Sequence, residues 1–242
     1  MPHGTPDWGL VGPKSTTYGL DDLGEHAVRL GSPHFFDRRG DVMFQTDFRD
    51  GLGDVYVATT GTNGRAQLWT GYSRTGPYCL GLYCASDGTH EAVLWKDLPY
   101  AVASSFGLEC SWSDDATIIF IAFGFQFVTP VLTYNADVRW VRIGSVLEYV
   151  NAGGVRVPFA AGVSYDNIPR VGNTVKLVGD LVNNNYMRVL WNNTLYSLAG
   201  IPLNGPGGGG PARLACYVRV VGTNLVHTEV HVDNVIITQN EP

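Results

Sequence analysis

The chain has 242 residues, of which 45% are hydrophobic and 16% charged. These fractions exclude a disordered protein and predict a globular domain with a sizeable core. The net charge of −6 argues against a nucleic-acid-binding protein, because contacts to phosphates need a basic face.

The N-terminal segment, residues 1–19, reads as an extended arm. It contains three prolines and four glycines, with Trp8 and Tyr18 as isolated large apolar side chains. Its start lacks the apolar stretch of a secretory signal, so we expect no signal peptide. The most apolar run of the chain, residues 116–128, is too short to cross a bilayer as a helix, so we also expect no transmembrane segment.

A short helix is predicted next, at about residues 22–30. Asp22 and Glu25 form a capping box, and Gly31 stands where such a helix would end. The apolar residues with helical spacing are Leu20, Leu23, Ala27 and Leu30. A helix of this length is unstable alone, so it is expected to dock on its own domain or on a partner.

From residue 41 onward the pattern is that of β-strands. We predict strands at 42–48, 55–59, 66–70, 78–83, 92–98, 117–128, 131–143, 175–181, 186–191, 195–198, 214–221 and 226–238. The stretch 117–128, TIIFIAFGFQFV, is typical of a central strand buried on both faces. Short strands at this spacing predict a β-sandwich or barrel, and without a fixed repeat a propeller or solenoid is not expected.

The glycine-rich stretch NGPGGGGPA, residues 204–212, is not predicted to bind phosphate. A P-loop ends in Lys-Ser/Thr and leads into a helix, whereas here the strand-like RLACYVRVV follows. We expect a flexible surface loop.

The C-terminal HTEVHVDNVIITQ carries two histidines and two acids on one strand face. At about 3.3 Å per residue, His227 and His231 lie roughly 13 Å apart, too far to share one metal ion. We therefore predict that His227, Glu229, His231 and Asp233 form a solvated strand face, while a carbohydrate or partner contact stays an alternative.

The sequence shows no pattern of a known catalytic centre. It lacks both E-x-D-x-x-E and G-x-S-x-G, so we expect no enzyme, although a Cys–His pair brought together by the fold stays open. The four cysteines form no zinc pattern and are expected to be buried free thiols. Cys79 and Cys84 lie on opposite faces of one strand and cannot bond each other, whereas a disulfide through Cys110 or Cys216 stays open.

Tryptophans on or near the predicted strands have two interpretations. The candidates for stacking on sugar rings are Trp69, Trp95 and Trp112. The alternative is that they are buried, because each covers a large apolar area.

Three segments resemble a known group of folds. VMFQTDFRDGLGDV resembles the first strand of carbohydrate-binding jelly rolls and concanavalin A-like sandwiches, and HTEVHVDNVIITQ resembles their last strand. VKLVGDLVNNNYMRVLWNNTLYSLAGIPL is similar to the paired strands near the end of laminin-G-like sandwiches. The resemblance implies an all-β jelly-roll β-sandwich of the concanavalin A-like type at 41–242, preceded by the arm and helix at 1–40.

The resemblance also implies a metal site. In many carbohydrate-binding jelly rolls the first and last strands share a structural calcium. The matching positions here are Asp47, the carbonyl near Gly51, and Asp233, and hard oxygen ligands of this kind suit calcium. No other cofactor is expected.

A second resemblance concerns the segment ahead of the sandwich. YGLDDLGEHAVRLGSPHFFDRRGDV before such a domain resembles phage structural proteins, in particular capsid-decorating proteins with a laminin-G-like fold. The residues that would contact a partner are Trp8, Tyr18, Leu20, Leu23 and Leu30. Alternatively, the arm packs across its own sandwich and covers an edge strand.

These inferences lead to one principal hypothesis and two alternatives. The principal hypothesis is a non-enzymatic virion protein, coat-associated or capsid-decorating, that associates with itself and with coat proteins and binds neither nucleic acid nor membrane. The first alternative is a carbohydrate-binding module, and the second is a glycosidase or lyase.

Overall fold

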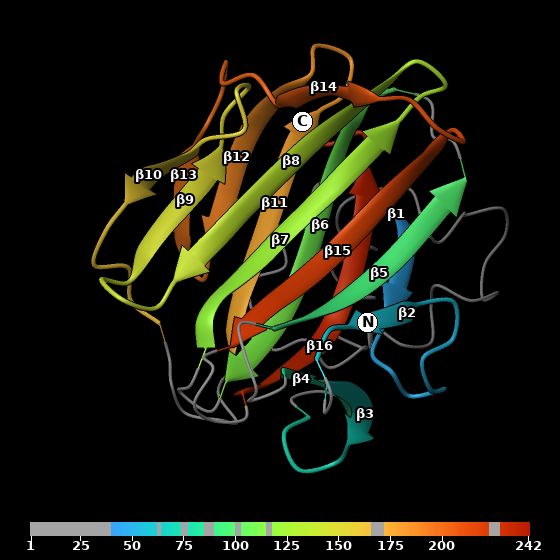
Figure 1. The fold of residues 1–242 in the computed structure, drawn as a ribbon, viewed down its shortest axis with the longest axis vertical. Coiled ribbons are helices and arrows are strands. Elements are labelled where there is room, and N and C mark those ends of the chain that lie inside the picture. The colour runs from blue at the N-terminus through green and yellow to red at the C-terminus, as the bar shows by residue number, and fades with distance from the viewer. Residues whose placement is uncertain are drawn as a thin grey trace, which may run out of the picture. The chain divides into compact units, whose positions relative to one another are not determined.

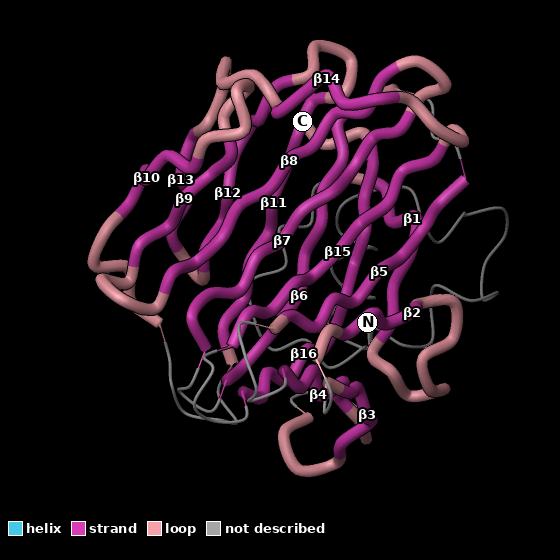
Figure 2. The backbone as a smooth tube through the Cα atoms, viewed as in Figure 1, coloured by secondary structure: helices cyan, strands magenta, loops and turns pink. Residues whose placement is uncertain are grey.

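The computed structural model describes residues 40–61, 64–73, 77–84, 90–99, 103–114, 118–165, 172–222 and 228–242. Within these ranges the chain forms sixteen strands in two eight-stranded antiparallel sheets. Figure 1 shows the two sheets stacked face to face, and Figure 2 shows no helix among the described residues. The expected all-β sandwich is therefore confirmed, whereas the helix predicted at about 22–30 lies outside the described residues.

The sheet nearer the viewer in Figure 1 is called the front sheet. Its main strand order is β10-β9-β8-β7-β15-β5-β2, and β14 pairs with β8. In this order the strands are β10 (Arg156–Ala160), β9 (Val146–Val150), β8 (Leu132–Val141), β7 (Ile118–Val128), β15 (Arg213–Gly222), β5 (Glu91–Pro99), β2 (Tyr56–Thr59) and β14 (Asn204–Gly208).

The second sheet is called the back sheet. Its main strand order is β13-β12-β11-β6-β16-β4-β3, and β1 pairs with β16. In this order the strands are β13 (Thr194–Ser197), β12 (Asn185–Trp191), β11 (Asn173–Asp180), β6 (Ser105–Asp114), β16 (Thr228–Gln239), β4 (Cys79–Cys84), β3 (Arg65–Trp69) and β1 (Asp41–Thr46).

Each predicted strand is present, and four further strands, β6, β9, β10 and β14, were not predicted. Strand β6 is the most consequential of these, because it pairs with both β11 and β16 in the middle of the back sheet. Its sequence, SFGLECSWSD, alternates with the strand period. The signal for β6 was therefore available in the sequence.

The core lies between the sheets, where alternate residues of each strand meet. Ile121 and Phe123 of β7 are fully buried there. In the same layer the rings of Trp112, Trp140 and Trp191 lie 5.6 to 6.2 Å apart. Trp112 is 1% exposed, so its prediction as a sugar-stacking residue is wrong. The alternation of residues along β6 shows that Trp112 shares a face with every second residue. It does not show whether the other sheet covers that face.

All four cysteines are buried free thiols, as predicted. Cys84 points into the core, and its thiol donates to the carbonyl of Val220 at 3.4 Å. Burial raises the pKa of the Cys84 thiol to about 11 and that of Cys79 to about 12. These thiols therefore stay protonated at neutral pH and serve as small apolar side chains.

Part of the glycine-rich stretch 204–212 is ordered as strand β14, which corrects the prediction of a flexible loop. Its residues pair with β8, and Thr133 Oγ1 donates to the carbonyl of Gly208 at 2.8 Å. At Gly209 a Cβ atom would lie 2.2 Å from the carbonyl oxygen of Pro130. The close approach to the turn after β7 explains why this position requires glycine.

The predicted solvated face of the last strand is also corrected. Glu229, His231 and Asp233 do share the outer face of β16, but His231 and Asp233 are each 3% exposed. His231 Nε2 lies 2.5 Å from Glu229 Oε1, and the imidazole stacks on Tyr72 at 4.1 Å. Tyr83 Oη also donates to Glu229 Oε1, at 2.8 Å. These contacts bury the outer face of β16. The alternation of residues along a strand cannot tell a face buried in this way from a solvated one. His227 lies outside the described residues.

The outer face of the back sheet also holds a buried ion-pair cluster. Glu241 places its carboxylate 2.7 Å from Lys176 Nζ and 2.6 Å from Arg188 Nη2. Thr238 Oγ1 donates to the same carboxylate at 2.5 Å. The side chains of Lys176 and Glu241 are 1% and 0% exposed. The cluster therefore fastens residues 240–242 onto β11, β12 and β16.

We predict that Glu241→Ala lowers the free energy of unfolding by about 3–5 kcal/mol, because it removes the carboxylate that neutralises two buried cations. The matched control is Asp97→Ala. Asp97 lies 3.7 Å from Arg213 and its side chain is 44% exposed, so its loss should cost less than about 1 kcal/mol. Urea denaturation measures both, and equal costs would contradict the assigned role of the cluster.

Candidate functional site

The outer face of the front sheet carries aromatic and charged side chains in a row across its strands. The register pairs Tyr56 with Trp95, Trp95 with Tyr217, Tyr217 with Gly124, and Gly124 with Asp137. At about 4.8 Å between strands, these four steps span about 19 Å. We call these five residues, together with Arg156 of β10, whose guanidinium reaches Asp137, the central row: Tyr56, Trp95, Tyr217, Gly124, Asp137 and Arg156.

Three aromatic rings form one half of the central row. The rings of Tyr56 and Trp95 are nearly parallel, 13° apart, with centroids separated by 6.5 Å. Trp95 also contacts Tyr217, whose ring centroid lies 4.9 Å away. Tyr56 is 48% exposed and Trp95 partly exposed, whereas Tyr217 is buried. The first two rings are therefore accessible to a ligand, and the third supports them.

Gly124 allows the ring of Tyr217 to lie across β7. A Cβ atom at this position would come within 2.5 Å of Tyr217 Cζ and Oη, and within 2.5 Å of the backbone oxygen of Ala136. No side chain fits this space without a shift of the backbone or the ring. Because residue 124 is glycine, the ring of Tyr217 can cross β7 and its hydroxyl can reach Asp137.

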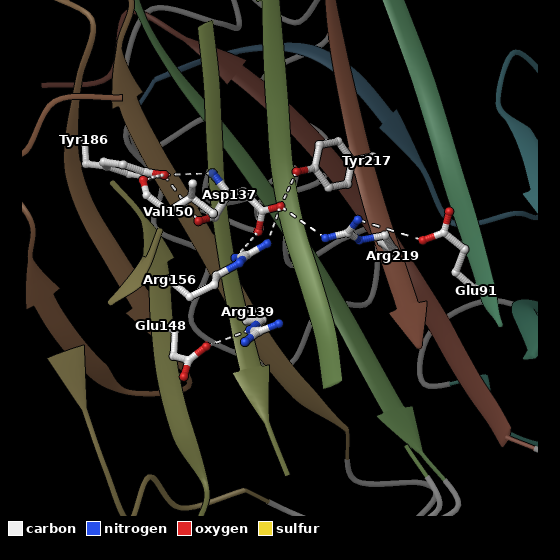
Figure 3. A network of polar contacts seen from close by, with 9 residues as sticks. All are labelled: Glu91, Asp137, Arg139, Glu148, Val150, Arg156, Tyr186, Tyr217 and Arg219. Carbon is white, nitrogen blue, oxygen red and sulfur yellow. Dashed lines mark hydrogen bonds and ion pairs between the residues drawn. The ribbon is translucent and has the colours of Figure 1, made fainter. Parts of the chain in front are cut away.

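Asp137 forms the centre of the other half of the row (Figure 3). Its carboxylate accepts two hydrogen bonds from Arg156, from Nη1 at 2.7 Å and from Nη2 at 2.9 Å. Tyr217 Oη donates to it at 2.6 Å, and Arg219 Nη2 lies 3.5 Å away. A bidentate arginine–carboxylate pair of this kind fixes the relative orientation of the two side chains and is stronger than a single hydrogen bond between neutral groups.

These contacts keep the donors of the row protonated. Burial and the adjacent Asp137 carboxylate raise the pKa of Tyr217 well above its ordinary value. Burial lowers the pKa of Arg156, but its hydrogen bonds to Asp137 raise it, with a net rise. At neutral pH Tyr217 therefore keeps the proton that it donates to Asp137, and the guanidinium of Arg156 stays charged.

A tyrosine of the back sheet anchors Asp137 from inside the sandwich. Tyr186, on β12, is 1% exposed and reaches across the core. Its hydroxyl accepts a hydrogen bond from the backbone N–H of Asp137 at 3.0 Å and donates to the carbonyl of Val150 at 2.9 Å. Figure 3 shows Tyr186 approaching β8 and β9 from the side opposite Tyr217. The position of Asp137 is thus tied to both sheets.

Further arginine–carboxylate pairs flank the central row. Arg139 Nε lies 2.7 Å from Glu148 Oε2, and Arg219 Nη1 lies 3.8 Å from Glu91 Oε2. The guanidinium groups of Arg139 and Arg219 also lie over the ring of Phe120, at 4.7 and 5.6 Å. The outer face therefore combines accessible rings with fixed hydrogen-bonding groups.

The other predicted stacking residues lie away from this row. Trp69, on β3, belongs to the outer face of the back sheet, where its indole N–H donates to the hydroxyl of Tyr83. Trp112 is in the core, as described above. Of the three candidates, Trp95 alone lies on the outer face of the front sheet.

The sequence did not single out the polar half of the row. Asp137 and Arg156 are 19 residues apart, and Asp137 and Tyr217 are 80 apart. An isolated aspartate between the apolar residues of β8 was the available signal. Its partners depend on sheet register, which the sequence pattern does not specify.

The residues implied for calcium are engaged with protein groups. Asp47 Oδ1 accepts the backbone N–H of Arg49 at 3.1 Å, and Asp47 Oδ2 lies 3.1 Å from Arg49 Nη2. Asp233 Oδ1 accepts the N–H of Asn234 at 2.9 Å. Gly51, in the turn after β1, donates its N–H to the carbonyl of Phe48. The contacts of Asp47 and Asp233 engage carboxylate oxygens that calcium would need, whereas the contact of Gly51 involves its N–H and not its carbonyl oxygen. The two carboxylates therefore fit the ion poorly, and the calcium site stays a prediction.

The described residues contain no group of three or more His, Cys, Asp or Glu side chains placed to hold a metal ion. They also contain no helix long and apolar enough to cross a membrane. The arm residues predicted to contact a partner, Trp8, Tyr18, Leu20, Leu23 and Leu30, lie outside this part of the chain.

The fold is similar to that of several solved proteins. A carbohydrate esterase of the Shiga toxin-encoding bacteriophage phi24B matches with a TM-score of 0.53 and 11% identity, over 84% of this chain and 100% of the esterase. The cellulose-induced protein Cip1 matches with a TM-score of 0.55 and 12% identity, over 81% of this chain and 96% of Cip1. The carbohydrate recognition domain of Emp47p matches with a TM-score of 0.55 and 13% identity, over 85% and 99%.

These likenesses confirm the concanavalin A-like jelly-roll sandwich that the terminal strands led us to expect. At identities this low they show the fold alone. No protein-family model and no curated protein sequence matches the chain.

We predict that Gly124→Ala lowers the free energy of unfolding by about 1–3 kcal/mol, because the added methyl group overpacks the space beneath Tyr217. The control is Gly208→Ala in β14, where a Cβ atom meets nothing within 4 Å and the change should stay within about 0.5 kcal/mol. Urea denaturation compares the two, and a neutral Gly124→Ala would show that Tyr217 does not need this glycine.

Proposed function

We propose that the protein binds carbohydrate on the outer face of its front sheet. The observation that carries this proposal is the pair of parallel, accessible rings, Tyr56 and Trp95, on the same face as the fixed pair of Arg156 and Asp137. A sugar ring has an apolar face that stacks on an aromatic ring and a rim of hydroxyl groups that donate and accept hydrogen bonds. The central row offers both kinds of contact within about 19 Å.

The fold supports the same function. Two of the similar proteins are described as a carbohydrate esterase and as a carbohydrate recognition domain. These descriptions apply to those proteins, and a fold by itself does not fix a ligand. They agree, however, with what the row of side chains on this chain can contact.

We further propose that binding occurs without catalysis. The carboxylates that the described strands place on this face are Glu91, Asp97, Asp137 and Glu148. Each of them contacts an arginine. A glycosidase works through one protonated carboxyl and one carboxylate that is free to act on the sugar or on water. Carboxylates that are paired with arginines are better suited to positioning those arginines than to acting as the acid or as the nucleophile or base of a glycosidase.

The virion role remains a separate prediction. It rested on the arm and helix at residues 1–40, and the described part of the chain supplies no contact that bears on it. A coat-associated protein could also bind glycan, so the two roles are compatible.

We predict that Trp95→Ala lowers the affinity for a glycan about tenfold or more, because it removes the larger ring of the pair. The matched control is Trp69→Ala, a partly exposed tryptophan on the other sheet, which should leave the affinity within about twofold. Binding is first measured on a panel of immobilised cellulose, xylan, mannan, β-1,3-glucan, polygalacturonate and alginate, with circular dichroism to check that each variant folds.

Two results would contradict the proposal. One is a panel on which the folded protein binds nothing. The other is a glycan whose binding depends on Trp69 and not on Trp95, which would move the site to the back sheet.

A further inference from the structure

The charges on the outer face of the front sheet balance. Within the described residues, its strands place on this face the arginines Arg139, Arg156, Arg213 and Arg219 and the acids Glu91, Asp97, Asp137 and Glu148. Four positive and four negative charges sum to zero, whereas the whole chain carries −6. Each arginine lies within 2.7 to 3.8 Å of a carboxylate on the same face. The face therefore offers hydrogen-bonding groups without a net charge.

Asp137 already pairs with the guanidinium groups to which an acidic ligand would bind. Both terminal nitrogens of Arg156 donate to its two oxygens, at 2.7 and 2.9 Å. Arg219 lies against the same carboxylate and reaches Glu91 on its other side. A carboxylate on a sugar would have to displace Asp137 from Arg156 while remaining beside it. Like charges held that close repel each other.

A neutral sugar meets no such conflict. A hydroxyl group donates one hydrogen bond and accepts others, so adjacent hydroxyls match a guanidinium and a carboxylate held side by side. The existing pairs can stay in place, and the rings of Tyr56 and Trp95 supply apolar contact that does not depend on charge.

This inference rests on the proposed glycan-binding function. We propose that the face takes uncharged glycans and that its paired carboxylates, Asp137 foremost, exclude glycans that carry uronic acids. Asp137 is then a specificity-determining residue as well as a structural one.

The test compares neutral polysaccharides with polygalacturonate and alginate at two salt concentrations. Wild-type protein should bind a neutral polysaccharide with an affinity that changes less than about twofold between about 50 and about 500 mM NaCl. It should bind the two uronate polymers more weakly. Asp137→Asn frees Arg156 and Arg219 from a charged partner and should raise the affinity for a uronate polymer about tenfold, with a steep salt dependence.

A second variant keeps the test decisive if Asp137→Asn does not fold. Glu148→Gln removes the charged partner of Arg139. The side chains of Arg139 and Glu148 are 24% and 18% exposed, and the change should raise the affinity for uronate polymers, as Asp137→Asn does. Folding of both variants is checked by circular dichroism.

The outcomes separate the two proposals. Tighter wild-type binding to uronates, weakening with salt, would overturn the neutral-glycan inference and leave glycan binding intact. Folded variants that gain no uronate affinity would overturn the role of the paired carboxylates. Binding to none of the polysaccharides would overturn the proposed function itself.

Discussion

The carboxylate of Asp137 holds the outer face of the front sheet in one arrangement. It receives two hydrogen bonds from Arg156, one from Tyr217 and an ion pair from Arg219. Side chains from β8, β10 and β15 therefore converge on one buried group. The backbone N–H of the same residue donates to Tyr186, which comes from the opposite sheet. A buried carboxylate needs this many partners, because one left unpaired would be costly.

The same constraint links the aromatic half of the row to the polar half. Tyr217 donates its hydroxyl to Asp137 and packs its ring against Trp95. Gly124 leaves the space in which that ring crosses β7. A shift at Asp137 would thus move the support beneath the accessible rings. A platform held in this way loses little conformational entropy when a ligand binds.

The two outer faces of the sandwich differ in how exposed their ion pairs are. On the back sheet, Glu241, Lys176 and Arg188 form a cluster that is almost inaccessible. On the front sheet the flanking pairs, such as Arg139 with Glu148, are partly exposed. Buried pairs of the first kind hold the fold, whereas accessible pairs of the second kind can exchange water for the hydroxyl groups of a ligand. The front face is therefore the better candidate for binding.

The sequence predicted the fold well, because strand alternation and turn residues are local signals. It missed strand β6, although FGLECSW alternates clearly, and it failed where the answer depends on register. Glu109 and Ser111 of β6 lie on the outer face of the back sheet, beside β11 and β16. The three tryptophans could not be told apart, because alternation does not say which face another sheet covers. The partners of Asp137 come from strands distant in sequence.

We propose that the front face binds glycan through the central row. The most direct measurement is an NMR titration of the isotope-labelled protein with a soluble oligosaccharide of the polysaccharide it retains. If the central row binds the glycan, we expect shifts of the Trp95 indole N–H and of the backbone amides of β5, β15, β7 and β8. Shifts confined to β3, β4 and β16 on the back sheet would contradict it, as would a spectrum that does not change.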